Sequence, residues 1–120
     1  MYKEKEEKAG YAKVEGPNLH HIITKTKVIL GRELKHKEDS QISSDEEVVS
    51  LGSNLKISRR HLLLYFDYDK CEWYAQNISK NPVFIDKLIF SRTDPPRRIS
   101  PIAAIQIDDE KFYFFQSKEE

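Results

Sequence analysis

The sequence has a single cysteine, Cys71, among its 120 residues. One thiol cannot form an intramolecular disulfide or a multi-cysteine metal site, and such scarcity is compatible with a reducing compartment. Lys and Arg together number 20, as do Asp and Glu, so the formal net charge is zero. No bulk electrostatic field would therefore draw the chain onto DNA or a membrane, and any recognition by charge must be local.

Long apolar runs are also absent. No stretch approaches the roughly 18 consecutive apolar residues that a membrane-spanning helix needs. The first ten residues are rich in Lys and Glu and lack the apolar centre of a signal peptide. We therefore expect a disordered charged leader over residues 1–10, no membrane partner, and a nuclear or cytoplasmic location.

Common enzyme and nucleotide-binding signatures are missing. The chain has no GxGxxG, GxxxxGK[ST], GxSxG or HExxH pattern. Ser58 and His61 lie close in sequence, but no third group completes a catalytic set. His20 and His21 are neighbours in a predicted strand and face opposite sides, so they cannot share an ion. We expect no enzymatic activity, no metal and no cofactor.

What the chain does contain is a series of short β-prone segments separated by turn signals, without the 3.6-residue periodicity of a helix. We predict strands at residues 11–14, 20–23, 27–31, 48–51, 62–66, 71–75, 83–85, 88–90, 102–107 and 112–115. Many short strands joined by turns predict an all-β sandwich or barrel. The length is that of one domain.

Side-chain alternation and turn residues add detail to this prediction. Along residues 71–75, alternation predicts that Cys71, Trp73 and Ala75 point inward, after a hairpin turn at residues 67–70. Residues 33–46 form a long polar segment, and long loops inside compact domains are usually functional or mobile. Residues 91–101 hold three of the five prolines, which predicts an irregular surface loop.

Three of the predicted strands stand beside loops whose side chains can donate hydrogen bonds to an anion. Gly31-Arg32 ends one strand, Lys56-Ile57-Ser58-Arg59-Arg60-His61 precedes the long strand at 62–66, and Ser79-Lys80-Asn81 precedes the strand at 83–85. Arginine offers a planar fork of donors that suits bidentate contact with a phosphate. If these loops meet at one end of a sheet, they form a phosphate-binding site.

The order and spacing of these blocks resemble the forkhead-associated (FHA) domain. Its pattern is a Gly-Arg pair, then Ser-x-x-His, then an aromatic strand and a Ser/Lys-Asn-Gly turn. The resemblance covers about residues 10–116 and is closest to the FHA domains of forkhead-type transcription factors, which carry an opening like residues 11–16 and a proline loop like residues 94–96. The winged-helix DNA-binding domain of those proteins is absent from this sequence, so the chain is either a fragment of a longer protein or a bare FHA module.

This resemblance implies an FHA-type β-sandwich of antiparallel or mixed sheets over residues 11–116, with binding loops at one end and a tail at 117–120. It implies a monomeric module that binds a phosphothreonine-containing protein in the nucleus, in transcription regulation or signalling. The residues expected at the phosphopeptide are Arg32, Ser58, Arg59, Lys80 and Asn81. Gly31 and His61 are expected to support the site, Gly31 by close backbone packing and His61 by bonding the backbone behind the loop.

Two departures from the pattern keep alternatives open. Asp86-Lys87 stands where the pattern has a second Asn-Gly-like turn. Pro82 stands where the pattern has a glycine after Asn81, and proline fixes φ and removes an N–H donor. A phosphate-independent interaction module on the same fold is therefore one alternative. Nucleic-acid binding is another, disfavoured by the zero net charge and the acidic residues 38–47; it would use Lys56, Arg59, Arg60, Arg97 and Arg98.

Overall fold

The computed structural model describes residues 11–32 and 45–117 of the chain. Eleven strands make up its regular structure: β1 (Ala12–Gly16), β2 (Leu19–Ile23), β3 (Lys27–Gly31), β4 (Glu47–Ser50), β5 (Leu62–Asp67), β6 (Glu72–Asn77), β7 (Val83–Ile85), β8 (Leu88–Phe90), β9 (Arg97–Arg98), β10 (Ile102–Ile107) and β11 (Glu110–Gln116). Within these ranges there is no helix, and so none long and apolar enough to span a bilayer.

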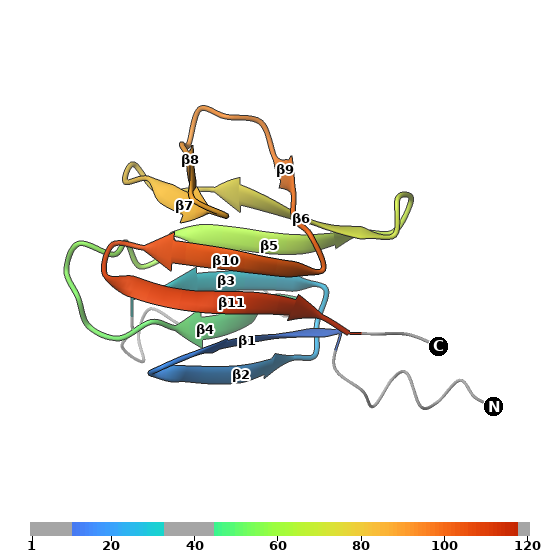
Figure 1. The fold of residues 1–120 in the computed structure, drawn as a ribbon, viewed down its shortest axis with the longest axis horizontal. Coiled ribbons are helices and arrows are strands. Elements are labelled where there is room, and N and C mark those ends of the chain that lie inside the picture. The colour runs from blue at the N-terminus through green and yellow to red at the C-terminus, as the bar shows by residue number, and fades with distance from the viewer. Residues whose placement is uncertain (1–10, 33–44, 118–120) are drawn as a thin grey trace.

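The strands form two sheets that pack face to face (Figure 1). The six-stranded sheet has the order β2-β1-β11-β10-β7-β8, and the five-stranded sheet has the order β4-β3-β5-β6-β9. The β3–β4 pair is parallel and the other pairs are antiparallel. The fold is the all-β sandwich expected from the sequence.

The core lies between the sheets and is built from the inward positions of each strand. Along β6 and β10, buried residues alternate with more exposed ones, as the two-residue period of a strand requires. Trp73 from the five-stranded sheet meets Phe114 from the six-stranded sheet edge to face, with ring centroids 5.5 Å apart. This aromatic contact joins the two sheets near the centre of the sandwich.

All ten predicted strands have a counterpart, with ends that agree within two residues. The prediction for Cys71 was wrong: its side chain is exposed, and it sits in the β5–β6 turn with a φ of 55°. The strand therefore begins at Glu72, and its inward face consists of Trp73, Ala75 and Asn77. The prediction of a wholly irregular segment at 91–101 was also wrong, because Arg97 and Arg98 pair with β6 as β9.

Some sequence-based expectations fall outside the described residues. They are the charged leader at residues 1–10, most of the polar loop at 33–46 and the tail beyond Ser117. The described end of that loop, Asp45 and Glu46, leads into β4, which lies parallel to β3.

The β7–β8 hairpin turns through Asp86 and Lys87, which have φ values of 52° and 72°. Two consecutive left-handed residues define the tight hairpin turn whose twist matches that of the flanking strands. The Asp86 carboxylate accepts a hydrogen bond from the backbone N–H of Ala104 at 2.9 Å. This bond fixes the hairpin against β10 and holds Phe84 and Lys87 on the outer face of the six-stranded sheet.

Two neighbouring aromatic residues of β11 provide a test of this packing. Phe114 is fully buried, whereas Tyr113 is 51% exposed. We expect Phe114→Ala to lower the free energy of unfolding by about 3–5 kcal/mol, because it opens a cavity between the sheets. Tyr113→Ala is the matched control and should cost less than about 1 kcal/mol. Chemical denaturation followed by tryptophan fluorescence measures both, and equal losses would contradict the strand's inward register.

Candidate functional site

The end of β3 and the β4–β5 connection are held together by backbone hydrogen bonds. The Arg32 N–H donates to the Ser58 carbonyl at 2.9 Å, and the His61 N–H donates to the Leu30 carbonyl at 3.0 Å. Register explains the contact, because Leu30 pairs with Leu62 at the point where β5 begins. The first two predicted loops therefore meet at one end of the five-stranded sheet.

Gly31 permits this close approach. A Cβ atom at this position would lie 1.9 Å from the Arg59 carbonyl oxygen and 2.8 Å from that of Ser58. Both are backbone atoms, which cannot rotate away as a flexible side chain could. A larger residue at position 31 would therefore push β3 away from the β4–β5 connection.

His61 contacts the backbone of the second loop through its side chain. Its side chain is buried, and its Nδ1 accepts a hydrogen bond of 3.0 Å from the Ser58 N–H. Because Nδ1 accepts, the neutral imidazole carries its proton on Nε2. Burial lowers the pKa of His61 below its usual value of 6.5, against the opposing influence of the nearby Asn81 and Pro82 carbonyls. Neither carbonyl completes a hydrogen bond to Nε2.

The third loop joins the second through a pair of hydroxyl groups. Ser58 Oγ and Ser79 Oγ are 2.7 Å apart, and Ser79 Oγ also accepts a hydrogen bond from the Asn81 N–H at 3.0 Å. Ser79 is buried, so its hydroxyl hydrogen needs an internal acceptor. Either hydroxyl can be the donor in this contact, and the half-buried Ser58 is the member of the pair that a ligand can reach.

Asn77 fixes the shape of the third loop. Its buried side-chain amide donates to the carbonyls of Asn81 at 3.0 Å and Phe90 at 2.9 Å, and its Oδ1 accepts from the Ser79 N–H at 2.8 Å. Asn81 in turn donates through Nδ2 to the Lys56 carbonyl at 3.1 Å. The third loop is therefore tied back to its own strand and across to the second loop.

Pro82 does not displace Asn81 from the other loops. Asn81 has no positive φ, which agrees with the expectation that a residue before proline avoids the left-handed region. The Asn81 side chain lies beside Lys56, His61 and Pro82 around a hollow of about 340 Å³. The hollow gives this end of the sandwich a concave surface next to Ser58.

The cationic side chains of the predicted set belong to the same three loops, but none of them lines the hollow, whose charged lining residues are Lys56 and Asp108. Arg32 is half-buried, and its guanidinium makes a long hydrogen bond of 3.4 Å to the Leu55 carbonyl. Arg59 and Lys80 are exposed. Three positive charges on three neighbouring loops, together with a hydroxyl and an amide, can bind a compact dianion with several acceptor oxygens.

Sequence reasoning gave no individual role to Ser79 or Asn77. Ser79 belongs to the Ser79-Lys80-Asn81 block, and Asn77 stands two residues before it. The available signal was the alternation along β6, which places a polar Asn77 on the same inward face as Trp73 and Ala75. A polar residue on a buried face usually satisfies backbone groups, and Asn77 does so.

The basic residues considered for nucleic-acid binding are divided between two elements. Lys56, Arg59 and Arg60 lie in the β4–β5 connection, and two more arginines form β9. Arg60 pairs with Glu46 at 3.4 Å. On β9, Arg98 pairs with Glu72 at 3.8 Å, and the Arg97 guanidinium lies 4.5 Å from the centre of the Phe90 ring.

The class of this protein follows from its all-β sandwich, in which basic and hydroxyl side chains stand on adjoining loops at one end. A family model described as "FHA domain" matches residues 28–108. The chain belongs to the FHA family, whose members are protein-interaction modules known for binding phosphothreonine.

Two curated relatives carry names from transcription. The chain is 28% identical over 106 residues to "Transcriptional activator FHA1" of Nicotiana tabacum, covering 88% of this chain and 48% of that protein. It is 28% identical over 82 residues to "Fork head protein homolog 2" of Schizosaccharomyces pombe, covering 67% of this chain and 13% of that protein. The chain therefore spans about half or less of the length of these relatives.

Solved structures share the fold. The FHA domain of MEK1, in complex with a phosphothreonine peptide of HOP1, matches with a TM-score of 0.65 and 20% identity over 92% of this chain and 100% of that chain. The FHA domain of CT664 from Chlamydia trachomatis matches with a TM-score of 0.60 and 18% identity over 89% of this chain and 96% of that chain. At sequence identities of 20% and 18%, the similarity to these two structures shows a shared fold and nothing further.

The lowered pKa of His61 predicts loss of stability in acid. The unfolded chain takes up a proton near the usual pKa of 6.5, whereas the folded chain resists it. The contribution of neutral His61 to the free energy of unfolding is therefore complete above about pH 6.5. It is lost as the pH falls toward and through the pKa of His61 in the folded chain. Protonation of Nδ1 also removes the acceptor for the Ser58 N–H.

Urea denaturation of wild type and His61→Asn between pH 7.5 and 5 measures this effect. We expect the difference in unfolding free energy between the two proteins to shrink as the pH falls. His20→Asn is the control, because His20 is exposed on β2, and it should leave that trend unchanged. Parallel profiles for wild type and His61→Asn would contradict the assignment.

Proposed function

We propose that this chain binds a phosphothreonine-containing partner protein and acts in transcription regulation or nuclear signalling. The proposal rests chiefly on the Ser58–Ser79 hydroxyl contact, which joins the second and third loops and places the half-buried Ser58 where they meet. The transcription-related names of two relatives support the nuclear setting. The bound phosphothreonine peptide in the MEK1 structure supports the ligand class.

In the proposed complex, each group has a distinct task. Arg32 binds two phosphate oxygens through its guanidinium, and Ser58 donates its hydroxyl hydrogen to a third. Lys80 and Arg59 add positive charge from either side, where a phosphate of about −1.5 to −2 charges would lie. Asn81 bonds the main chain of the ligand through the capacity of its amide that Lys56 does not use.

Removal of Arg32 tests the phosphate contact. We expect Arg32→Ala to weaken phosphothreonine-peptide binding by about 2–4 kcal/mol and Ser58→Ala by about 1–2 kcal/mol, because a charged donor contributes more than a neutral one. Isothermal titration with a peptide selected from a phosphothreonine library measures both. Arg92→Ala, at an exposed arginine in the turn after β8, is the matched control.

Two further ligands separate the alternatives. The unphosphorylated form of the same peptide should bind wild type far more weakly, and duplex DNA should not compete. Equal binding of both peptide forms would favour a phosphate-independent module. Undiminished binding by Arg32→Ala would end the proposal for the phosphate.

The third loop has its own test. We expect Asn81→Ala to weaken phosphopeptide binding by about 1–2 kcal/mol, the value of one or two hydrogen bonds. The loss should be smaller than for Arg32→Ala because no formal charge is removed. Asn18→Ala, in the exposed β1–β2 turn, serves as the control. If Asn81→Ala binds like wild type while Arg32→Ala does not, the ligand is held by the first two loops alone.

A further inference from the structure

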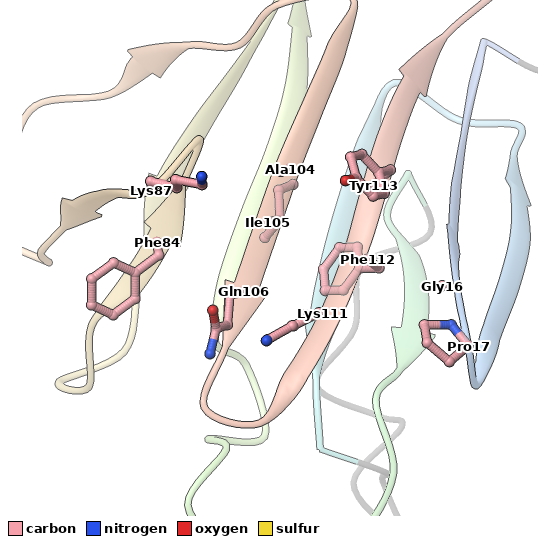
Figure 2. A pocket seen from close by; sticks show the side chains of 10 residues that line it. All are labelled: Gly16, Pro17, Phe84, Lys87, Ala104, Ile105, Gln106, Lys111, Phe112 and Tyr113. Atoms are coloured by element: carbon pink, nitrogen blue, oxygen red, sulfur yellow. The ribbon is translucent and has the colours of Figure 1, made fainter.

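A second and larger hollow lies on the outer face of the six-stranded sheet. It has a volume of about 560 Å³ and crosses β7, β10 and β11 toward the β1–β2 turn (Figure 2). Its side chains include Phe84 and Lys87 from the β7–β8 hairpin, Ala104 and Gln106 from β10, and Lys111 and Tyr113 from β11. We call this hollow the outer groove.

Strand register explains how the outer groove arises. Gln106 pairs with Phe84 on one side and with Lys111 on the other, so these three residues form a row across the sheet. In the adjacent row, Ala104 pairs with Tyr113. The methyl group of Ala104 is too short to fill the space between Tyr113 and the hairpin, and that space is the floor of the groove.

Phe84 connects the outer groove to the candidate phosphopeptide site. Its ring lines both the groove and the smaller hollow beside Asn81. The connection follows from the chain, because Asn81 and Pro82 lead directly into β7. Three residues of extended chain span about 10 Å. A ligand that leaves the loops on this side therefore reaches Phe84 within three or four residues.

The outer groove is apolar in its centre and positive at its edges. Phe84 is 39% exposed and Tyr113 is 51% exposed, so two aromatic rings face solvent across it. Its charged lining residues are Lys87 and Lys111, and in the described part of the chain neither has an ion-pair partner. An occupant of complementary chemistry has an apolar or aromatic side chain beside acidic residues.

We propose that the outer groove binds a second segment of the same phosphorylated partner, a segment with apolar and acidic residues. This inference rests on the proposed function, because the phosphothreonine delivers the segment to the groove. Three strand spacings separate β7 from β1, about 14 Å, so some four extended residues cross the groove. Tethering makes the second contact intramolecular, and a weak contact then adds measurably to affinity.

Extended peptides test the proposal directly. The short probe is a nine-residue phosphothreonine peptide selected from an oriented library. Two long probes add Gly-Ser-Gly-Glu-Phe-Glu-Leu-Glu, one at each end of that peptide. Control extensions carry Lys for Glu, or Ser for Phe and Leu. We expect the acidic-apolar extension at one end to tighten binding about tenfold, and both control extensions to lose most of this gain.

Substitutions in the outer groove test whether the gain in peptide affinity arises there. Ala104→Phe fills the groove floor and should abolish the gain while leaving short-peptide affinity unchanged. Ile102→Phe is the matched control, because Ile102 is exposed on the same strand outside the groove. The double variant Lys87→Glu and Lys111→Glu should remove the gain and favour the Lys extension. This second variant tests the groove even if the added Phe ring disturbs β10.

The outcomes are distinct. If the short probe binds but no extension tightens binding, or if the gain survives Ala104→Phe, the groove proposal is wrong and the proposed function stands. If the short probe does not bind, both are wrong. Sedimentation that reveals a dimer abolished by Ala104→Phe would assign the groove to a second copy of the chain and overturn the proposal.

Discussion

The candidate site depends on hydrogen bonds made by one buried amide. Asn77 uses its donor group on two carbonyls and its oxygen on the Ser79 N–H, which fixes a loop that has no regular structure of its own. Ser79 can then accept from Asn81 and contact Ser58. A buried polar network of this kind is rigid when all its members are satisfied, so Ser58, which we propose as a ligand-binding residue, is held by a buried neighbour.

The contact between β3 and the β4–β5 connection depends on the missing side chain of Gly31. Gly31 lets β3 approach the β4–β5 connection so closely that Arg32 bonds the backbone of Ser58. Loops held this way do not have to be ordered when a ligand arrives, which lowers the entropic cost of binding. The buried His61 side chain accepts a hydrogen bond from the Ser58 N–H in the same turn. A buried residue therefore helps to fix the candidate site.

Phe84 lies between the two hollows on the surface of the sandwich. Its neighbours Val83 and Ile85 fill the core, while its own ring faces outward between the two hollows. The hairpin that carries it is fixed by the bond from Ala104 to Asp86. Because side chains alternate along β7, its two buried residues stabilise the sandwich while its exposed residue forms part of the surface beside the loops.

The sequence by itself determined the strands, the all-β class and the order of the anion-binding loops, because these follow from local alternation and turn residues. It did not place Cys71, because the strand begins one residue later and Cys71 lies in the turn with a positive φ, and it missed β9 among the prolines. Only the tertiary structure decided that Ser79 meets Ser58, that Asn77 bridges Asn81 and Phe90, and that Ala104 leaves a groove. Those contacts join residues that are distant in the chain, and they arise from strand register and sheet packing, which local sequence does not encode.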